Sequence, residues 1–457
     1  MIDSLLADLA PPGATVTALA VDSEGAVLAK RNPDRVAAPA SNVKLITAAA
    51  ALESLSPDFQ VATTVQAAGR IEDRVLDGDI HLIGGGAPDF DHAALRSLAR
   101  AVEDQVDTVT GDLVLDTTLF EGPRYGPGRA WEDAQFAYGA PTTALSLDKN
   151  VASVRVAVDA AGDVEIDVEP ATSVINIDVS ELVTEKDTPD GTADADGSRV
   201  TTDNGPTVRA ESSDGSISVQ GFLSRGDEFE TLVPIRQPIE HTMRVAREAL
   251  VDCGVVVKGG SIVKSEPEAA LPDEGLTDLG TVRSAPLGEL VRTMNVDSDN
   301  VMADTLARVV AADTTGTGSW SEWADLVRSR LDRLGVRSGH ITDGSGLSRY
   351  NRLSARAMVT VLRHVAETPW APTFFKSLPE PGEGTLSERL HGLPVRAKTG
   401  SLTDARALSG RLLRNGEPIY FSLLVDGITR NVTAVRERQD DVVRALAGCD
   451  SSSMHTS

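Results

Sequence analysis

Hydrophobic and polar positions divide the 457-residue chain into a central segment with one pattern and flanking regions with another. Residues 151–230 alternate apolar and polar side chains with a period of two, between clusters of Gly, Asp and Thr, which is typical of half-buried strands. Outside this segment, runs with helical spacing of apolar residues alternate with short predicted strands. The pattern therefore predicts an all-β insert within a chain that is otherwise α/β.

Helices are predicted on both sides of the insert. The run LITAAAALESL contains no Gly or Pro and predicts a helix that opens near Ser41. Residues 75–83 predict a strand, and the Asn415-Gly416 turn predicts a hairpin. The other predicted helices cover residues 91–105, 239–252, 286–294, 298–312, 321–334, 354–367 and 434–447. These elements predict a mixed sheet covered by helices.

Length and composition indicate a globular protein and exclude some classes of function. The chain is too long for one ordinary core, so two or three domains are expected. The formal net charge of -25 disfavours nucleic acid and anionic membranes as partners. Only 8 of the 43 basic residues are Lys, which resembles salt-adapted proteins, with an acidic protein from a GC-rich genome as the alternative. The insert carries 18 acidic and 5 basic residues, which favours a solvated spacer over a binding domain.

Metal sites, disulfides and membrane segments are not expected. Cys253 and Cys449 are too few for a disulfide framework or a zinc site, and the seven His have no metal-ligand spacing. No segment approaches 18 apolar residues, and MIDSLLADLAPPG lacks the basic and apolar parts of a signal peptide. The sequence as written therefore predicts a cytoplasmic protein without a transmembrane segment, and it gives no indication of an oligomeric state.

Three Ser-x-x-Lys pairs are candidates for nucleophilic chemistry, because this spacing can place a hydroxyl and an amine on one helical face. The pairs are Ser41/Lys44, Ser146/Lys149 and Ser261/Lys264. Only Ser41 opens a helix-forming run; the other two pairs lie in segments that predict strand or loop, and in a strand residues three apart point to opposite faces.

Ser41 at a helix N-terminus would gain from the helix dipole and from backbone N–H groups that can bind an oxyanion. Lys44 can accept its proton if its surroundings lower the pKa of the amine. The alternative for Ser41 is a serine that only caps the helix.

A second motif, Ser298-Asp299-Asn300, opens another predicted helix and is the only Ser-x-Asn in the sequence. Its residues can act as a helix cap. Alternatively, the hydroxyl of Ser298 relays a proton between Lys44 and a leaving amine, while the amide of Asn300 holds the peptide group of a substrate.

A third motif, Lys398-Thr399-Gly400, is followed by Ser401 on a predicted edge strand. A cationic edge strand can pair with an extended peptide and bind its terminal carboxylate, and Gly400 allows the ligand to approach closely. An ordinary Lys near a turn is the alternative.

The order Ser-x-x-Lys, Ser-Asp-Asn, Lys-Thr-Gly is that of penicillin-binding proteins and class A β-lactamases. The roughly 254 residues between the first two motifs are more than a compact β-lactamase has. The chain therefore resembles the PBP4-type D-alanyl-D-alanine carboxypeptidase/endopeptidases of peptidase family S13. The stretches HLIGGGAPDF, YGAPTTALSLDKN and DGSGLSRYN agree with that family.

The resemblance implies a multi-domain α/β protein. Its β-lactamase/transpeptidase-like domain would have mixed helices around an antiparallel sheet and would carry a nested insertion that includes a small all-β domain. The expected parts are a catalytic domain (1–58 and 272–450), a second domain (59–150 and 236–271), an acidic β-rich third domain (151–235) and a tail (451–457).

The resemblance also implies a serine-type D-Ala-D-Ala carboxypeptidase, with endopeptidase activity as a further option, that acts through an acyl-enzyme without a cofactor. Its partners would be peptides ending in D-Ala-D-Ala, and β-lactams would be covalent inhibitors. A β-lactamase or esterase on the same site is one alternative, and a non-catalytic binding protein that keeps the fold is another.

Specific roles follow from the same resemblance. Ser41 is expected to be the nucleophile, Lys44 the base and Ser298 the proton relay. Backbone N–H groups of Ser41 and Ser401 would form the oxyanion hole. The substrate would be bound by Asn300, Lys398, Thr399, Gly400 and Ser401, and Asp133 would meet a cationic group of the stem peptide.

Overall fold

The structure is a computed structural model that describes residues 2–170, 175–184, 207–210, 216–265 and 276–448. The chain forms two compact units. Unit 1 spans residues 1–61, 119–130 and 283–457, and unit 2 spans residues 62–118 and 131–282. Cys449 and the expected tail lie outside the described residues. Unit 1 is thus assembled from three separate stretches of sequence.

Unit 1 is built on a five-stranded antiparallel sheet with the order β19-β20-β21-β1-β2. Its strands are β1 (Thr15–Val21), β2 (Val27–Arg31), β19 (Val395–Leu402), β20 (Ala405–Arg414) and β21 (Glu417–Asp426). Asn415 and Gly416 join β20 to β21 with φ values of 55° and 86°, as a tight hairpin turn requires. The predicted hairpin is confirmed, and so is the edge position of the strand that carries Lys398.

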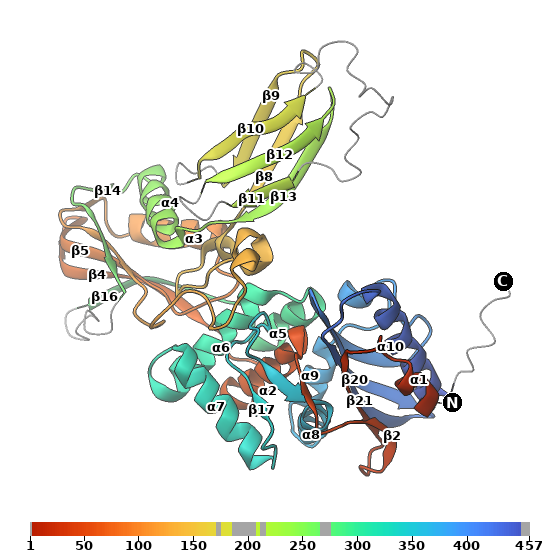
Figure 1. Ribbon diagram of the computed structural model, residues 1–457. Coiled ribbons are helices and arrows are strands. Elements are labelled where there is room, and N and C mark those ends of the chain that lie inside the picture. The colour runs from red at the N-terminus through yellow and green to blue at the C-terminus, as the bar shows by residue number, and fades with distance from the viewer. Residues whose placement is uncertain (1, 171–174, 185–206, 211–215, 266–275, 449–457) are drawn as a thin grey trace. The chain divides into compact units, whose positions relative to one another are not determined.

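The helices of unit 1 either pack against this sheet or form a group beside it (Figure 1). They are α1 (Ile2–Ala7), α2 (Val43–Leu55), α5 (Leu287–Val296), α6 (Asn300–Thr315), α7 (Trp320–Arg333), α8 (Ala355–Ala366), α9 (Ala371–Ser377) and α10 (Val432–Ala447). On one face, α1 and α10 bury Leu6, Val442 and Leu446 in a core that includes Phe421 of β21. A small sheet of β3 (Val36–Ala37), β17 (Gly339–His340) and β18 (Arg352–Ser354) completes the unit. The predicted helices of this unit are confirmed to within a few residues at their ends, whereas α1 and α9 had no counterpart among the predictions.

Unit 2 contains a seven-stranded mixed sheet and a β-rich segment. The sheet consists of β4 (Ala62–Glu72), β5 (Val75–Ile83), β6 (Thr108–Val109), β7 (Leu113–Asp116), β14 (Val256–Val257), β15 (Ser261–Lys264) and β16 (Leu276–Arg283). It is accompanied by α3 (His92–Glu103) and α4 (Pro238–Asp252), which pack against each other.

The β-rich segment confirms the predicted all-β insert. Two three-stranded sheets form it, with the orders β13-β8-β9 and β10-β12-β11. Its strands are β8 (Val151–Val158), β9 (Val164–Glu169), β10 (Ile177–Thr184), β11 (Thr207–Ala210), β12 (Ile217–Leu223) and β13 (Glu228–Pro234). Alternate residues such as Val154, Val156, Ile217 and Val219 are buried in a common core, as a period of two requires.

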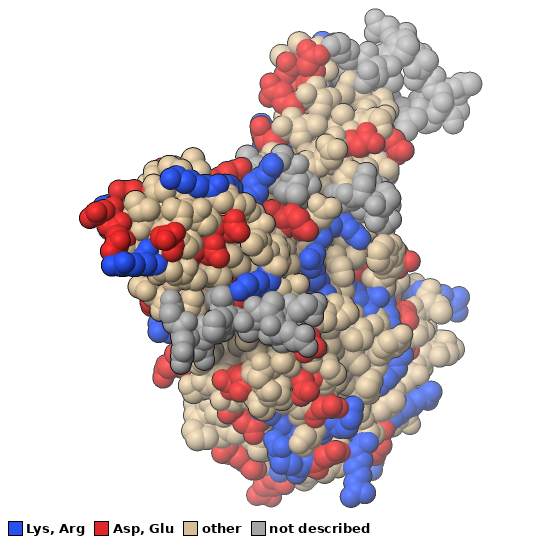
Figure 2. Space-filling view, turned by 90° about the vertical axis from the view of Figure 1, so that its left-hand side faces the viewer, with Lys and Arg blue, Asp and Glu red and all other residues tan. Residues whose placement is uncertain are grey.

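Within the described parts of the chain, no helix has the length and apolar character needed to cross a membrane. Figure 2 shows acidic side chains spread over the whole visible face rather than gathered in one patch. On this face the acidic side chains are interspersed with Lys and Arg, and the formal net charge of -25 implies general self-repulsion among the surface charges.

We expect the stability of the protein to rise with salt concentration. Dispersed like charges repel one another at low ionic strength, and this repulsion is screened within a Debye length of roughly 3 Å at 1 M salt. Thermal unfolding should therefore occur at a clearly higher temperature at about 3 M than at about 0.1 M potassium chloride. Equal unfolding temperatures would contradict the salt-adapted interpretation.

Candidate active site

Ser41 lies in a short 3₁₀ turn, η1 (Ala40–Asn42), directly before α2. The N-cap of α2 is Asn42, and its side chain makes no capping bond, so the interpretation of Ser41 as a helix cap is wrong. Ala40 has a φ of 48°, a left-handed conformation that is unusual for a residue other than glycine. Gly346 packs against this turn so closely that a Cβ there would lie 2.0 Å from the Ala40 carbonyl oxygen. Contact with Gly346 therefore stabilises the turn that presents Ser41.

Lys44 lies one helical turn after Ser41 and is completely buried. Its Nζ donates to Ser41 Oγ at 3.1 Å, to Asn300 Oδ1 at 2.6 Å and to the Ser345 carbonyl oxygen at 2.7 Å. Burial lowers the pKa of Lys44 to about 8, although the carboxylates of Asp304, Asp343 and Asp299 oppose this shift. The first two predicted residues are thus in direct contact.

The Ser298-Asp299-Asn300 motif connects α5 to α6. Asp299 caps α6, because its carboxylate accepts from the backbone N–H of Met302 at 2.9 Å. Ser298 precedes it with a φ of 58° and is half-buried. Asp299 is therefore the residue of this motif that caps α6, and Asn300 is the one that contacts Lys44.

The Lys398-Thr399-Gly400 motif lies on β19, and Lys398 is completely buried. Its Nζ donates to the Thr399 carbonyl oxygen at 3.1 Å, and Asn42 Nδ2 donates to the Lys398 carbonyl oxygen at 2.9 Å. A Cβ at Gly400 would lie 2.9 Å from the Pro39 carbonyl oxygen and 3.1 Å from the Cβ of Ala40. Glycine at this position therefore lets the edge strand approach the turn that carries Ser41, next to the exposed Ser401.

The competing Ser-x-x-Lys pairs have the geometry expected for strand or loop. Ser146 is buried and donates to the Thr143 carbonyl oxygen at 2.9 Å, while Lys149 has a φ of 59° in a kinked turn. Ser261 and Lys264 are the two ends of strand β15. Of the three pairs, only Ser41/Lys44 combines the start of a helix with a hydrogen bond between hydroxyl and amine.

Asp133 belongs to unit 2, whereas the other candidate residues belong to unit 1. It lies in a 3₁₀ turn, η2 (Trp131–Gln135), and accepts a hydrogen bond from Tyr138 Oη at 3.0 Å. No cluster of three or more His, Cys, Asp or Glu suited to a metal ion occurs in the described ranges.

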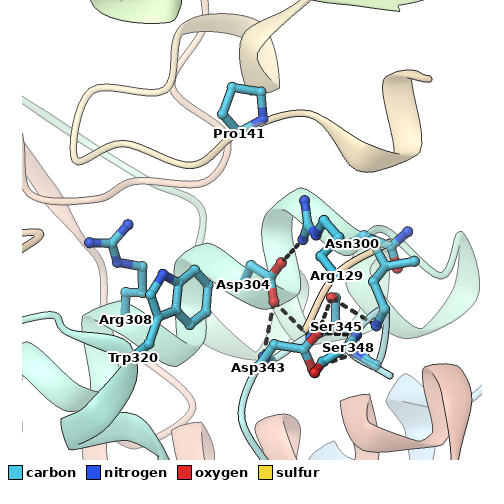
Figure 3. Close-up of polar contacts among 12 residues, drawn as sticks. Arg129, Pro141, Asn300, Asp304, Arg308, Trp320, Asp343, Ser345 and Ser348 are labelled. Atoms are coloured by element: carbon cyan, nitrogen blue, oxygen red, sulfur yellow. Dashed lines mark hydrogen bonds and ion pairs between the residues drawn. The ribbon is translucent and has the colours of Figure 1, made fainter. Parts of the chain in front are cut away.

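The sequence analysis missed a group of buried charged residues that includes Arg129, Asp304 and Asp343 (Figure 3). Asp304 of α6 forms an ion pair with Arg129, and both side chains are almost completely buried. Asp304 also accepts from the backbone N–H groups of Gly344 and Ser345. The sequence does contain one indication of this group, because Asp304 lies one helical turn after Asn300 in an otherwise apolar run.

Comparisons with known proteins identify the family of this chain. Residues 1–448 match the family model of the D-Ala-D-Ala carboxypeptidase 3 (S13) family. A D-alanyl-D-alanine carboxypeptidase of Actinomadura sp. (strain R39) is 32% identical over 93% of this chain and 80% of its own length. The D-alanyl-D-alanine carboxypeptidase DacB of Haemophilus influenzae is 28% identical over 91% of this chain and 86% of its own.

Solved structures share the fold. Penicillin-binding protein 4 (dacB) from Haemophilus influenzae superimposes with a TM-score of 0.81 at 24% identity, covering 97% of this chain and 99% of that one. The predicted multi-domain α/β fold with its nested insertion is thereby confirmed, and so is the predicted family. The chain belongs to the D-Ala-D-Ala carboxypeptidase 3 (S13) family of serine-type peptidases.

Proposed function

We propose that the protein is a D-Ala-D-Ala carboxypeptidase in which Ser41 is the nucleophile and Lys44 its base. The observation that carries this assignment is the set of three contacts made by Lys44 Nζ. Two of the partners, Asn300 Oδ1 and the Ser345 carbonyl oxygen, can only accept hydrogen bonds. When Lys44 is neutral, its two N–H groups serve these acceptors and its lone pair accepts from the Ser41 hydroxyl, so the hydrogen bond that the protonated amine donates to Ser41 Oγ reverses its direction.

The pKa of Lys44 supports the same role. A lysine with an ordinary pKa is almost entirely protonated at neutral pH and cannot take a proton from serine. The buried amine, with a pKa lowered to about 8, is present in part as the free base near neutrality. Proton transfer from Ser41 is then geometrically direct and accessible near physiological pH.

The reaction that we propose proceeds in two steps. Ser41 Oγ bonds to the carbonyl carbon between the two D-Ala residues while its proton passes to Lys44, and the oxyanion is bound by the backbone N–H groups of Ser41 and Ser401. The C–N bond then breaks, and the leaving D-Ala amine receives the proton through Ser298. Water hydrolyses the acyl ester and restores Ser41.

The substrate carboxylate is expected at β19. Burial and the charge of Lys44 hold the pKa of Lys398 well below its usual range. A carboxylate beside Thr399 and Ser401 would favour protonation of Lys398, so its positive charge would develop together with substrate binding. Because β19 is the edge strand of its sheet, an extended peptide can pair with it, and the amide of Asn300 is expected to bind the peptide group of that substrate.

Two further parts of the proposal concern the inserted domains. We assign residues 1–58 and 272–450 to the catalytic domain, 59–150 and 236–271 to the second domain and 151–235 to the acidic third domain, except that the segment 119–130 joins the catalytic domain because it packs within unit 1. Asp133 is assigned to a cationic group on the stem peptide. The hydrogen bond from Tyr138 supports this assignment, because it fixes the orientation of the carboxylate.

The proposed activity is tested by the release of D-Ala from a pentapeptide that ends in D-Ala-D-Ala. We expect the wild-type protein to release D-Ala and to hydrolyse nitrocefin only slowly. Replacing Lys398 with Ala should raise KM more than it lowers kcat, because this residue contributes mainly to capture of the carboxylate. Lys376→Ala, at an exposed Lys of α9, is the matched control and should leave both constants unchanged.

Rapid nitrocefin turnover without D-Ala release would instead identify a β-lactamase. Normal penicillin binding with neither activity would identify a non-catalytic binding protein. An unchanged KM in the Lys398→Ala protein would contradict the assignment of the carboxylate site to β19.

A further inference from the structure

We propose that Asp304 and Arg129 form a positioning pair, which holds the Ser345 carbonyl oxygen against Lys44 and balances the charge around its amine. The pair is linked to Lys44 through the backbone of Ser345, so it acts through Lys44. This inference rests on the proposed role of Lys44 as the base. Figure 3 shows the residues involved, which come from three separate segments of unit 1.

The link from Asp304 to Lys44 passes through one loop. Asp304 Oδ1 accepts from the backbone N–H of Gly344 at 2.9 Å and from that of Ser345 at 2.8 Å. The carbonyl oxygen of Ser345 in turn accepts from Lys44 Nζ at 2.7 Å. Since Asp304 is on a helix that begins with Asn300, one rigid element positions two of the three partners of Lys44.

The loop itself is fixed by a second carboxylate. Asp343 accepts from the backbone N–H groups of Gly346 at 3.0 Å and Ser348 at 2.7 Å, and from Asn351 Nδ2 at 2.7 Å. Both Asp343 and Ser345 are completely buried. The two carboxylates together therefore fix the position of the Ser345 carbonyl oxygen.

Arg129 lies in the segment 119–130, which forms hydrogen bonds with other parts of unit 1 along its length. Arg308 of α6 donates to the carbonyl oxygen of Glu121 at 2.8 Å, and Trp320 Nε1 donates to that of Pro123 at 2.8 Å. The backbone N–H of Arg349 donates to the carbonyl oxygen of Gly128 at 2.7 Å. Arg129 then pairs with Asp304, and their side chains are only 5% and 1% exposed. A charge pair this deeply buried is costly unless both partners are present.

The charges that act on Lys44 come from every element packed around it. Asp304, Asp343 and Asp299 raise its pKa, whereas Arg129 lowers it, and Lys398 is a further buried cation that interacts with it. Burial raises the pKa of Asp304 to about 6, with Arg129 opposing this rise, so the carboxylate is ionised at pH 7 and above. Removing the charge of Asp304 and removing that of Arg129 should therefore shift the titration of Lys44 in opposite directions.

The test compares Asp304→Asn with Arg129→Met. Asparagine keeps an oxygen that can accept from Gly344 and Ser345, so it removes the charge while preserving the acceptor. The readout is the second-order rate constant for acylation by benzylpenicillin between about pH 6 and pH 10, which rises as Lys44 loses its proton. We expect this rise to move down by about one pH unit in Asp304→Asn and up by about one unit in Arg129→Met.

Two controls separate charge from folding. Arg129→Lys keeps a cation and should retain the wild-type midpoint. Asp34→Asn removes the carboxylate of an exposed ion pair with Arg356 and should change neither the midpoint nor the rate. If Asp304→Asn does not fold, as judged by circular dichroism, the test is the difference in acylation midpoint between Arg129→Met and Arg129→Lys.

Unchanged midpoints in Asp304→Asn and Arg129→Met, or shifts in the same direction, would overturn the positioning pair while leaving the proposed function intact. If the Lys44→Ala protein shows the wild-type rise with pH, Lys44 is not the titrating base. That outcome would overturn the proposed mechanism itself, so the two failures are distinguishable.

Discussion

Replacing Ser41 with Ala is expected to abolish covalent labelling by penicillin and the release of D-Ala. The reason is that the Oγ atom forms the ester in both reactions, and in the described part of the chain no other hydroxyl is seen to contact Lys44 Nζ. Tryptic mass spectrometry of the wild-type protein should find the adduct on VAAPASNVK, the peptide of residues 36–44. The effect should be a complete loss rather than a reduction.

The other two Ser-x-x-Lys pairs provide matched controls. Ser146→Ala and Ser261→Ala should retain full labelling. The hydroxyl of Ser146 donates a hydrogen bond to the Thr143 carbonyl oxygen, and Ser261 lies on a strand. An adduct on a peptide that contains Ser146 or Ser261 would refute the assignment of the active site. So would undiminished release of D-Ala by the Ser41→Ala protein.

Replacing Lys44 with Ala should slow acylation by penicillin about 10³-fold while Ser41 remains in place. The loss is large because, among the described residues, Lys44 is the only base in contact with Ser41 Oγ. Rapid-mixing measurements of acylation report the rate, and circular dichroism reports whether the fold survives the loss of a buried amine. Lys149→Ala and Lys264→Ala are the controls and should acylate at the wild-type rate. An unchanged rate for Lys44→Ala would assign the base to another group.

The sequence was informative where chemistry and local structure coincide. Ser41 and Lys44 are one helical turn apart in a run of good helix formers, so their proximity follows from helix geometry alone. The alternation in residues 151–230 predicted strands because a half-buried sheet requires it. Lys398 was predicted on an edge strand and lies on one.

Other features depend on contacts between distant residues. Arg129 and Asp304 are separated by 175 positions, and no local pattern indicates that the segment 119–130 packs into unit 1. The cap of α6 is Asp299 rather than Ser298, because Ser298 adopts a left-handed backbone conformation that its residue type does not suggest. The helices α1 and α9 are short, and packing rather than periodicity stabilises elements of that length.

The order of strands in unit 1 has a consequence for biosynthesis. Strand β1 pairs with β2 on one side and with β21 on the other, and the register with β21 joins Thr15 to Asp426. The emerging chain therefore carries Ser41 and Lys44 long before the central strands of their sheet have been translated. Such non-local pairing makes closure of the sheet a late event, because one edge of β1 stays unpaired until β21 has been translated. The contacts that surround the nucleophile come from Asn300, Ser345 and Gly400, so they can form only after these later segments have been translated.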